Sequence, residues 1–149
     1  MKTTKKNLKY QSPGINEVSR YEKLHTVTFE NSKEGSVSIA REICDLVKVK
    51  QEKNKNCVIG FATGSSPTKV YQEIIRIHKE ESLSFKNVIA FNLDEYFPIN
   101  KDDKNSYHHF MKENLFDHID IPAENINIPS GEIKENHVKK YCIQYEKKI

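Results

Sequence analysis

Short apolar runs recur along the chain, each bounded by polar residues. Residues 57–61 and 88–91 are almost entirely apolar, which is typical of strands buried on both faces of a parallel sheet. Residues 26–29 and 126–128 are shorter but also rich in β-branched or apolar side chains, which favours strands there too. The pattern therefore predicts three or four short strands.

Between these runs, apolar residues recur every three or four positions, which predicts amphipathic helices. This spacing covers residues 33–49, 67–80, 107–115 and 138–145. Strands that alternate with helices indicate a parallel sheet with helical crossovers. We expect an α/β fold of three layers, Rossmann-like. We also expect a truncated one, because the sheet is small and the last helix reaches Ile149 without a C-cap glycine.

The chain of 149 residues is of a size for one domain. Residues 1–24 are polar, include the turn signal Ser12-Pro13-Gly14, and are expected to form an extension outside the core. Residues 25–149 then form the folded part. Cys44, Cys57 and Cys142 are scattered, without a C-x-x-C pair, and are expected to be small core residues rather than ligands or disulfides.

Charge excludes some classes of partner. Lys and Arg total 24 against 21 Asp and Glu, and the two signs are interspersed rather than gathered on one helix, so no nucleic-acid partner is expected. The N-terminal lysines are not followed by an apolar leader, and no apolar stretch is long enough to span a bilayer. The sequence therefore predicts a cytoplasmic protein without a membrane partner.

A loop with two glycines and three hydroxyl residues joins the first buried run to a helix. Its sequence, from Gly60, is Gly-Phe-Ala-Thr-Gly-Ser-Ser-Pro. Glycine permits a tight turn, Ser66 and Pro67 are suited to start a helix, and free N–H groups at a helix start favour an anion. The loop is neither a P-loop nor G-x-G-x-x-G. Either it is a plain capped turn, or it binds a small phosphate.

Two adjacent carboxylates follow the second buried run. Asp94 and Glu95 come directly after it, and ligands bind beyond the carboxyl ends of strands in open parallel sheets. A carboxylate there can move a proton on a bound sugar. From the residues alone, the favoured interpretation is that both acids are solvated loop acids or caps. His108 and His109 are adjacent and point about 100° apart on a helix, so no metal site is predicted.

Taken together, these motifs resemble one family. Ala62-Thr63-Gly64-Ser65-Ser66-Pro67 resembles the phosphate loop of glucosamine-6-phosphate deaminases, and Phe91-Asn92-Leu93-Asp94-Glu95-Tyr96 resembles their second signature. Ser106-Tyr107 and the segment 116–126 continue the likeness in the same order. The resemblance covers about residues 25–149.

The resemblance implies an activity: glucosamine 6-phosphate and water give fructose 6-phosphate and ammonia. It implies that Thr63, Gly64, Ser65 and Ser66 bind the phosphate and that Asp94 is the base that moves a proton between C1 and C2. Ala62, Glu95, Tyr96 and Tyr107 are candidate pocket residues. The reaction needs no cofactor and no metal. The family commonly forms homo-oligomers.

Two departures from the family pattern matter. Phe97-Pro98-Ile99 stands where the family often has Val-Gly-Leu. The family's later motif, Gly-x-x-x-Asp-Gly-His, is absent from the sequence, so this chain alone is expected to be inactive. Two other interpretations stay open: a 6-phosphogluconolactonase, although those enzymes look like Asp-Glu-Arg at residues 94–96, and a sugar-phosphate sensor without catalysis.

Overall fold

The computed structural model describes residues 26–149, and its centre is a sheet of three parallel strands in the order β1-β2-β3. The strands are β1 (Cys57–Phe61), β2 (Val88–Asn92) and β3 (Ile126–Asn127). β1 and β2 are paired along their whole length, from Cys57 opposite Val88 to Phe61 opposite Asn92. The predicted parallel α/β sheet with helical crossovers is confirmed.

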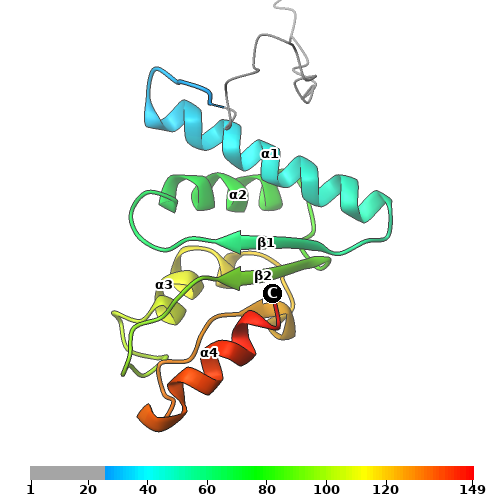
Figure 1. Cartoon of the computed structure of the whole chain (residues 1–149). Helices are drawn as coiled ribbons and strands as arrows, with labels where there is room; N and C mark the ends of the chain where they lie inside the picture. The colour runs from blue at the N-terminus through cyan, green and yellow to red at the C-terminus, as the bar shows by residue number, and fades with distance from the viewer. Residues whose placement is uncertain (1–25) are drawn as a thin grey trace, which may run out of the picture.

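Four α-helices connect and cover these strands (Figure 1). They are α1 (Ser32–Glu52), α2 (Thr68–Glu81), α3 (Tyr107–Asn114) and α4 (Val138–Glu146). Short 3₁₀ turns lie at 116–118, 123–125 and 135–137. All four predicted helices are present, and each begins or ends within a few residues of the predicted bound.

Helix starts follow ordinary capping chemistry at two places. Asn31 accepts a hydrogen bond from the Glu34 N–H (3.0 Å), and its amide donates back to the Glu34 carboxylate (2.7 Å), which fixes the start of α1. Ser106 accepts from the His109 N–H (3.0 Å) at the start of α3. These bonds satisfy backbone donors that have no partner within a helix.

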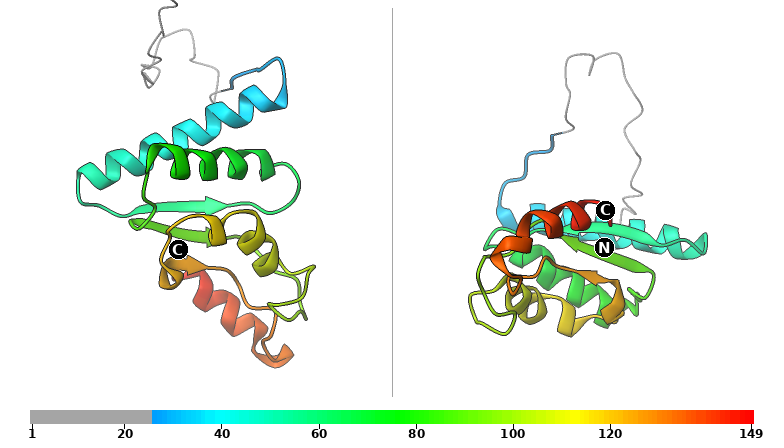
Figure 2. Two further views of the ribbon diagram at one scale, coloured as in Figure 1. Left: turned by 180° about the vertical axis from the view of Figure 1, so that it is seen from behind. Right: turned by 60° about the horizontal axis from the view of Figure 1, so that its bottom comes forward.

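The sheet has helices on both faces, which gives the predicted three layers. Val88, Ala90 and Asn92 are buried on the side of α2 and α3, whereas Phe91 of the same strand contacts Tyr145 of α4 with ring centroids 6.2 Å apart. Figure 2 shows α4 opposite α2 and α3 across the strands. α1 packs against α2 through a buried stripe, Ala40, Cys44 and Val47.

The core lies between the sheet and the helices α2 and α3. Its fully buried side chains come from all of these elements, and they include Ile74, Ile77, Phe85, Val88, Met111 and Leu115. Burying an aliphatic or aromatic side chain of this kind stabilises the fold by about 1.5–3 kcal/mol relative to exposure. The apolar residues that recur at helical spacing in α2 and at the end of α3 therefore form the core, whereas Val37 of α1 and Cys142 of α4 are exposed.

Three expectations from the sequence are wrong. Residues 26–29 form no strand, because a β-rich composition alone does not make a strand. β1 is not buried on both faces: Val58 is 60% exposed on the side away from α2. Cys44 and Cys57 are core residues as expected, but Cys142 is exposed.

Candidate active site

The carboxyl ends of β1 and β2 lie side by side. Phe61 and Asn92 are paired residues, and the buried Asn92 amide donates a hydrogen bond to the Phe61 carbonyl (2.8 Å). The loop that begins at Ala62 and the loop that carries Asp94 therefore leave the sheet from one edge. The structure places the two predicted halves of the site together, as the rule for parallel sheets leads one to expect.

The loop of residues 62–67 has the conformation of a tight turn into α2. Gly64 has a φ of +98°, a value that L side chains rarely adopt, and it accepts a hydrogen bond from the Thr68 hydroxyl (3.3 Å). The Tyr71 hydroxyl donates to the Ala62 carbonyl from within the core, and burial raises the pKa of Tyr71 to about 12. The loop is thus tied to α2 at its first residue and at its glycine.

The hydroxyl groups of this loop have no internal partner. Ser65 and Ser66 are exposed, Thr63 is half-buried, and none of the three side chains makes a hydrogen bond within residues 26–149. Ser66 does not cap α2 as predicted, because Pro67 occupies the N-cap position in a helical conformation and no side chain caps the helix. All three hydroxyls are therefore available to a ligand at the start of α2, where a negative charge is favoured.

The two adjacent carboxylates have different surroundings. Asp94 is exposed, and its side chain makes no hydrogen bond to any described residue. The Glu95 side chain is only 1% exposed. It accepts hydrogen bonds from the backbone N–H groups of Tyr107 (2.8 Å) and His108 (3.0 Å), the first two residues of α3. Glu95 is a helix cap, one of the two alternatives that the sequence left open, whereas Asp94 is free to act on a ligand.

The aromatic candidates Tyr96 and Tyr107 lie together beside these carboxylates. Their ring centroids are 4.7 Å apart, and the ring planes are inclined by 41°. Tyr96 is exposed, and Tyr107 is half-buried at the start of α3. Tyr96 follows Asp94 by two residues, so the pair stands on the loop that carries Asp94 and at the start of α3.

Sequence reasoning missed the residues that hold the two loops in place. Asn92 was only part of a motif, yet its amide joins the ends of β1 and β2. His108 was considered only as a metal ligand and excluded as one, but its Nδ1 lies 3.0 Å from the Glu95 carboxylate. A polar residue at a buried position of an apolar run was the available signal for Asn92. Within residues 26–149, no three His, Cys, Asp or Glu side chains are arranged to hold a metal ion.

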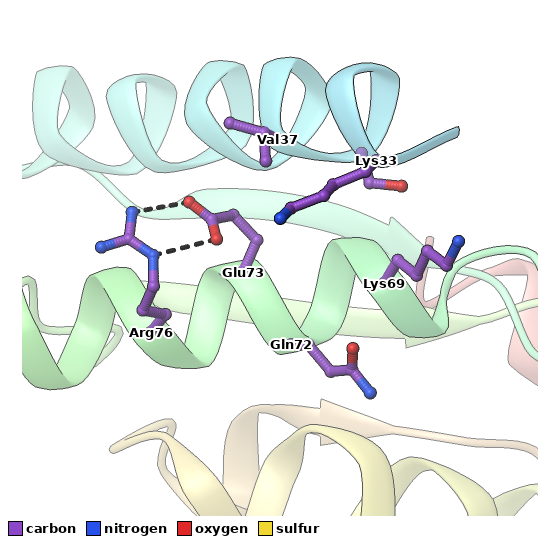
Figure 3. A pocket seen from close by; sticks show the side chains of 7 residues that line it. Lys33, Val37, Lys69, Gln72, Glu73 and Arg76 are labelled. Carbon is purple, nitrogen blue, oxygen red and sulfur yellow. Dashed lines mark hydrogen bonds and ion pairs between the residues drawn. The ribbon is translucent and has the colours of Figure 1, made fainter. Parts of the chain in front are cut away.

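A hollow of about 350 Å³ lies elsewhere, between α1 and α2 (Figure 3). Lys33 and Lys69 line it at one end, and Glu73 and Arg76 line it at the other, where their side chains pair at 2.6 Å. None of the predicted site residues lines this hollow. It is a groove between two packed helices.

The comparison with known families decides the assignment. Residues 30–149 match the family model described as glucosamine-6-phosphate isomerases/6-phosphogluconolactonase. The chain belongs to this family. Among curated relatives, the glucosamine-6-phosphate deaminase of Borrelia garinii subsp. bavariensis is 44% identical over 123 residues, which are 82% of this chain and 44% of that protein.

A second curated relative is much longer. A glucosamine-6-phosphate deaminase-like protein of Bacteroides thetaiotaomicron is 44% identical over 132 residues, 89% of this chain but 20% of that protein. The family's chains thus range widely in length around the matched region. This chain spans less than half the length of the two relatives named here.

Solved structures agree with the fold. A structure described as a monomeric glucosamine-6-phosphate deaminase superposes with a TM-score of 0.77 at 35% identity, over 83% of this chain and 49% of that one. A 6-phosphogluconolactonase from Thermotoga maritima gives a TM-score of 0.60 at 21% identity, over 82% of this chain and 51% of that one, which shows a shared fold and no more. Within residues 26–149, no helix is both long and apolar enough to cross a membrane.

Proposed function

We propose that the complete gene product converts glucosamine 6-phosphate and water into fructose 6-phosphate and ammonia. The observation that carries the proposal is the pairing of Phe61 with Asn92. It brings a loop of free hydroxyls at a helix start and a free carboxylate, Asp94, to one edge of the sheet. The relatives named as glucosamine-6-phosphate deaminases, at 44% and 35% identity, support this substrate.

In this proposal the loop holds the phosphate. The hydroxyls of Thr63, Ser65 and Ser66 and the backbone around Gly64 donate to phosphate oxygens, and the N-terminal end of α2 favours the negative charge. Because α2 is packed in the core through Val70 and Ile74, the phosphate end of the sugar is fixed relative to the sheet. The sugar carbons then lie toward the end of β2.

Asp94 moves the proton. As a base, its carboxylate removes the proton on C2 of the open-chain aldose and returns it to C1, which converts the amine-bearing aldose into a ketose imine. Water then adds to the imine carbon, and ammonia leaves. Glu95 cannot take this role, since its carboxylate is buried and engaged with the start of α3.

We further propose that residues 25–149 are the N-terminal part of a sugar-phosphate isomerase/deaminase domain, preceded by the polar extension 1–24. Two observations support this division. The chain covers 44% of the Borrelia garinii deaminase and 49% of the solved monomeric deaminase, and Val58 on the outer face of β1 is 60% exposed. A groove for the sugar and a group that opens its ring would then come from outside these 149 residues, so the isolated chain is expected to be inactive.

Ammonia release from glucosamine 6-phosphate tests the function. The complete gene product should release ammonia, and Asp94→Asn should lower kcat by about 10²- to 10⁴-fold, the contribution that a positioned base makes to a proton transfer. Asp102→Asn, a change of the same kind in an exposed loop acid, is the control and should leave kcat unchanged. A folded gene product that releases no ammonia would refute the deaminase. Lactone hydrolysis would then favour the lactonase, and binding without turnover the sensor.

Localisation and assembly are separate parts of the proposal. We propose a cytoplasmic enzyme, because its substrate is a phosphorylated sugar, and a homo-oligomer when complete. Light scattering of the complete gene product measures the assembly directly. A monomer would contradict the expected oligomer and would match the solved deaminase that is described as monomeric.

A further inference from the structure

The proposed base, Asp94, has no side-chain bond of its own to orient it. Its carboxylate is exposed and makes no hydrogen bond within the part of the chain that the structure describes. Its backbone, however, lies between two fixed residues. Asn92, two positions before it, is 2% exposed and bonded to the end of β1, and Glu95 follows it directly. The position of the base therefore depends on these two neighbours.

Glu95 is held by four contacts from two directions. Its Oε1 accepts from the N–H groups of Tyr96 (2.9 Å) and Tyr107 (2.8 Å). Its Oε2 accepts from the His108 N–H (3.0 Å) and lies 3.0 Å from the His108 Nδ1. Both carboxylate oxygens are thus used, and the residue after Asp94 is joined to a helix that begins twelve positions later in the sequence.

The charge of Glu95 suits this anchoring role. Burial by itself raises the pKa of Glu95, but the hydrogen bonds from Tyr107, His108 and Tyr96 outweigh it and hold the pKa below its ordinary value. The carboxylate is therefore ionised at neutral pH. An ionised carboxylate at the first turn of α3 is favoured by the helix dipole, and charge-assisted hydrogen bonds of this kind are among the strong ones.

We propose that Glu95 is the positioning residue for Asp94: by binding the first turn of α3 it fixes where the base stands relative to the phosphate loop. This inference rests on the proposed function of Asp94. The reasoning is geometric. A reacting group must be held to a fraction of an ångström, and a misplacement of about 1 Å can cost about 100-fold in rate. Removing Glu95 should thus act on the rate of the chemical step, not on the binding of the phosphate.

The first variant is Glu95→Gln in the complete gene product. Glutamine offers one acceptor oxygen in place of two and sets an NH₂ group against a backbone N–H of α3, so the anchor is lost while the size is kept. We expect kcat to fall about 10- to 100-fold while KM for glucosamine 6-phosphate stays within about twofold, because the phosphate loop follows β1 and is untouched. Glu124→Gln, the same change at an exposed residue of a 3₁₀ turn, is the matched control and should change neither value.

A second variant keeps the proposal testable if Glu95→Gln does not fold. His108→Phe keeps a ring but removes the nitrogen that contacts Glu95, and it leaves the three backbone donors, so the fold is retained, and we expect a several-fold lower kcat at unchanged KM. His137→Phe, at an exposed histidine, is its control. Circular dichroism and thermal melting establish which variants are folded.

The outcomes separate two failures. A wild-type protein that releases no ammonia refutes the proposed function itself. An active wild type whose folded Glu95→Gln variant keeps its kcat, or whose KM rises as much as its kcat falls, refutes the positioning role alone. If only His108→Phe is folded, an unchanged kcat in that variant refutes it equally.

Discussion

Gly64 offers a test of whether the phosphate loop has the conformation described here. Its φ of +98° is reached easily by glycine and rarely by other residues, whereas a Cβ added at this position would meet no atom within 4 Å. Gly64→Ala therefore introduces backbone strain without a steric clash. A matched control lies four residues away. At Gly60 a Cβ would also meet nothing within 4 Å, and the backbone there does not have a positive φ.

The difference between the two variants isolates the strain. Both replacements restrict the unfolded chain to the same extent, which stabilises each by about 0.4–1 kcal/mol. Only Gly64→Ala forces an L-residue into the left-handed region, at a cost of about 1–2 kcal/mol. Because the unfolded-state contribution cancels, Gly64→Ala should be less stable than Gly60→Ala by about 1–2 kcal/mol.

Urea denaturation followed by circular dichroism measures this difference. At an m-value of about 2 kcal/mol/M, the midpoint of Gly64→Ala should lie about 0.5–1 M below that of Gly60→Ala, with equal m-values. Midpoints that agree within about 0.2 M would refute the positive φ of Gly64. The proposal that this loop is a preformed phosphate site would then also have to be abandoned.

Three further predictions concern stability and reactivity. Tyr145→Phe should cost about 1–2 kcal/mol in urea denaturation, because its hydroxyl lies 2.7 Å from the Asn92 carbonyl and 2.9 Å from the Asn127 carbonyl. An unchanged midpoint would contradict these bonds. Burial raises the pKa of Asp120, but hydrogen bonds from the Phe85 N–H and the Ser84 hydroxyl outweigh it and lower that pKa. The stabilisation is thus present above the ordinary Asp pKa and lost on acidification. The unfolding free energy of Asp120→Asn should therefore fall less than that of the wild type between about pH 5 and pH 3, and parallel curves would contradict this. Iodoacetamide at pH 8 should modify the exposed Cys142 within minutes and leave Cys44 unmodified until the protein unfolds, because burial raises the pKa of Cys44 to about 12. Mass spectrometry of the peptides measures which cysteine is labelled. Early labelling of Cys44 would show an open core.

The elements that were predictable are those whose signal is local. The 3.6-residue period of α2 names Val70, Ile74 and Ile77 as one face, and the structure buries all three. The prediction of a strand at residues 26–29 was wrong, because strand formation requires a neighbouring strand and is not decided by the local composition of the segment. The prediction that both faces of β1 are buried was wrong for a related reason. An apolar run shows that Val58 can be buried, but what covers Val58 is decided by residues far from it in the sequence.

The candidate site likewise has one feature that was predictable from the sequence and one that was not. That the two loops meet at one edge follows from parallel strands and was predictable, since parallel pairing sets the end of β1 beside the end of β2. Which hydroxyl groups of the loop make no hydrogen bond within the described residues was not predictable. Ser66 is a residue type that commonly caps a helix, but Pro67 occupies the cap position, and this leaves the Ser66 hydroxyl available to a ligand.

The two carboxylates at residues 94 and 95 show why a motif alone does not assign roles. They are chemically alike and adjacent, so composition and spacing offer no ground on which to make one a base and the other a cap, and only the family resemblance favours Asp94 as the base. The distinction arises when α3 places its first N–H groups against residue 95 and leaves residue 94 in solvent. A buried carboxylate whose pKa is lowered by its donors is a poor proton shuttle, and an exposed one without partners is a poor anchor. Glu95 is therefore suited to the role of a helix cap, and Asp94 to the proposed role of a base. The contact between Glu95 and the start of α3, twelve residues later, makes this difference.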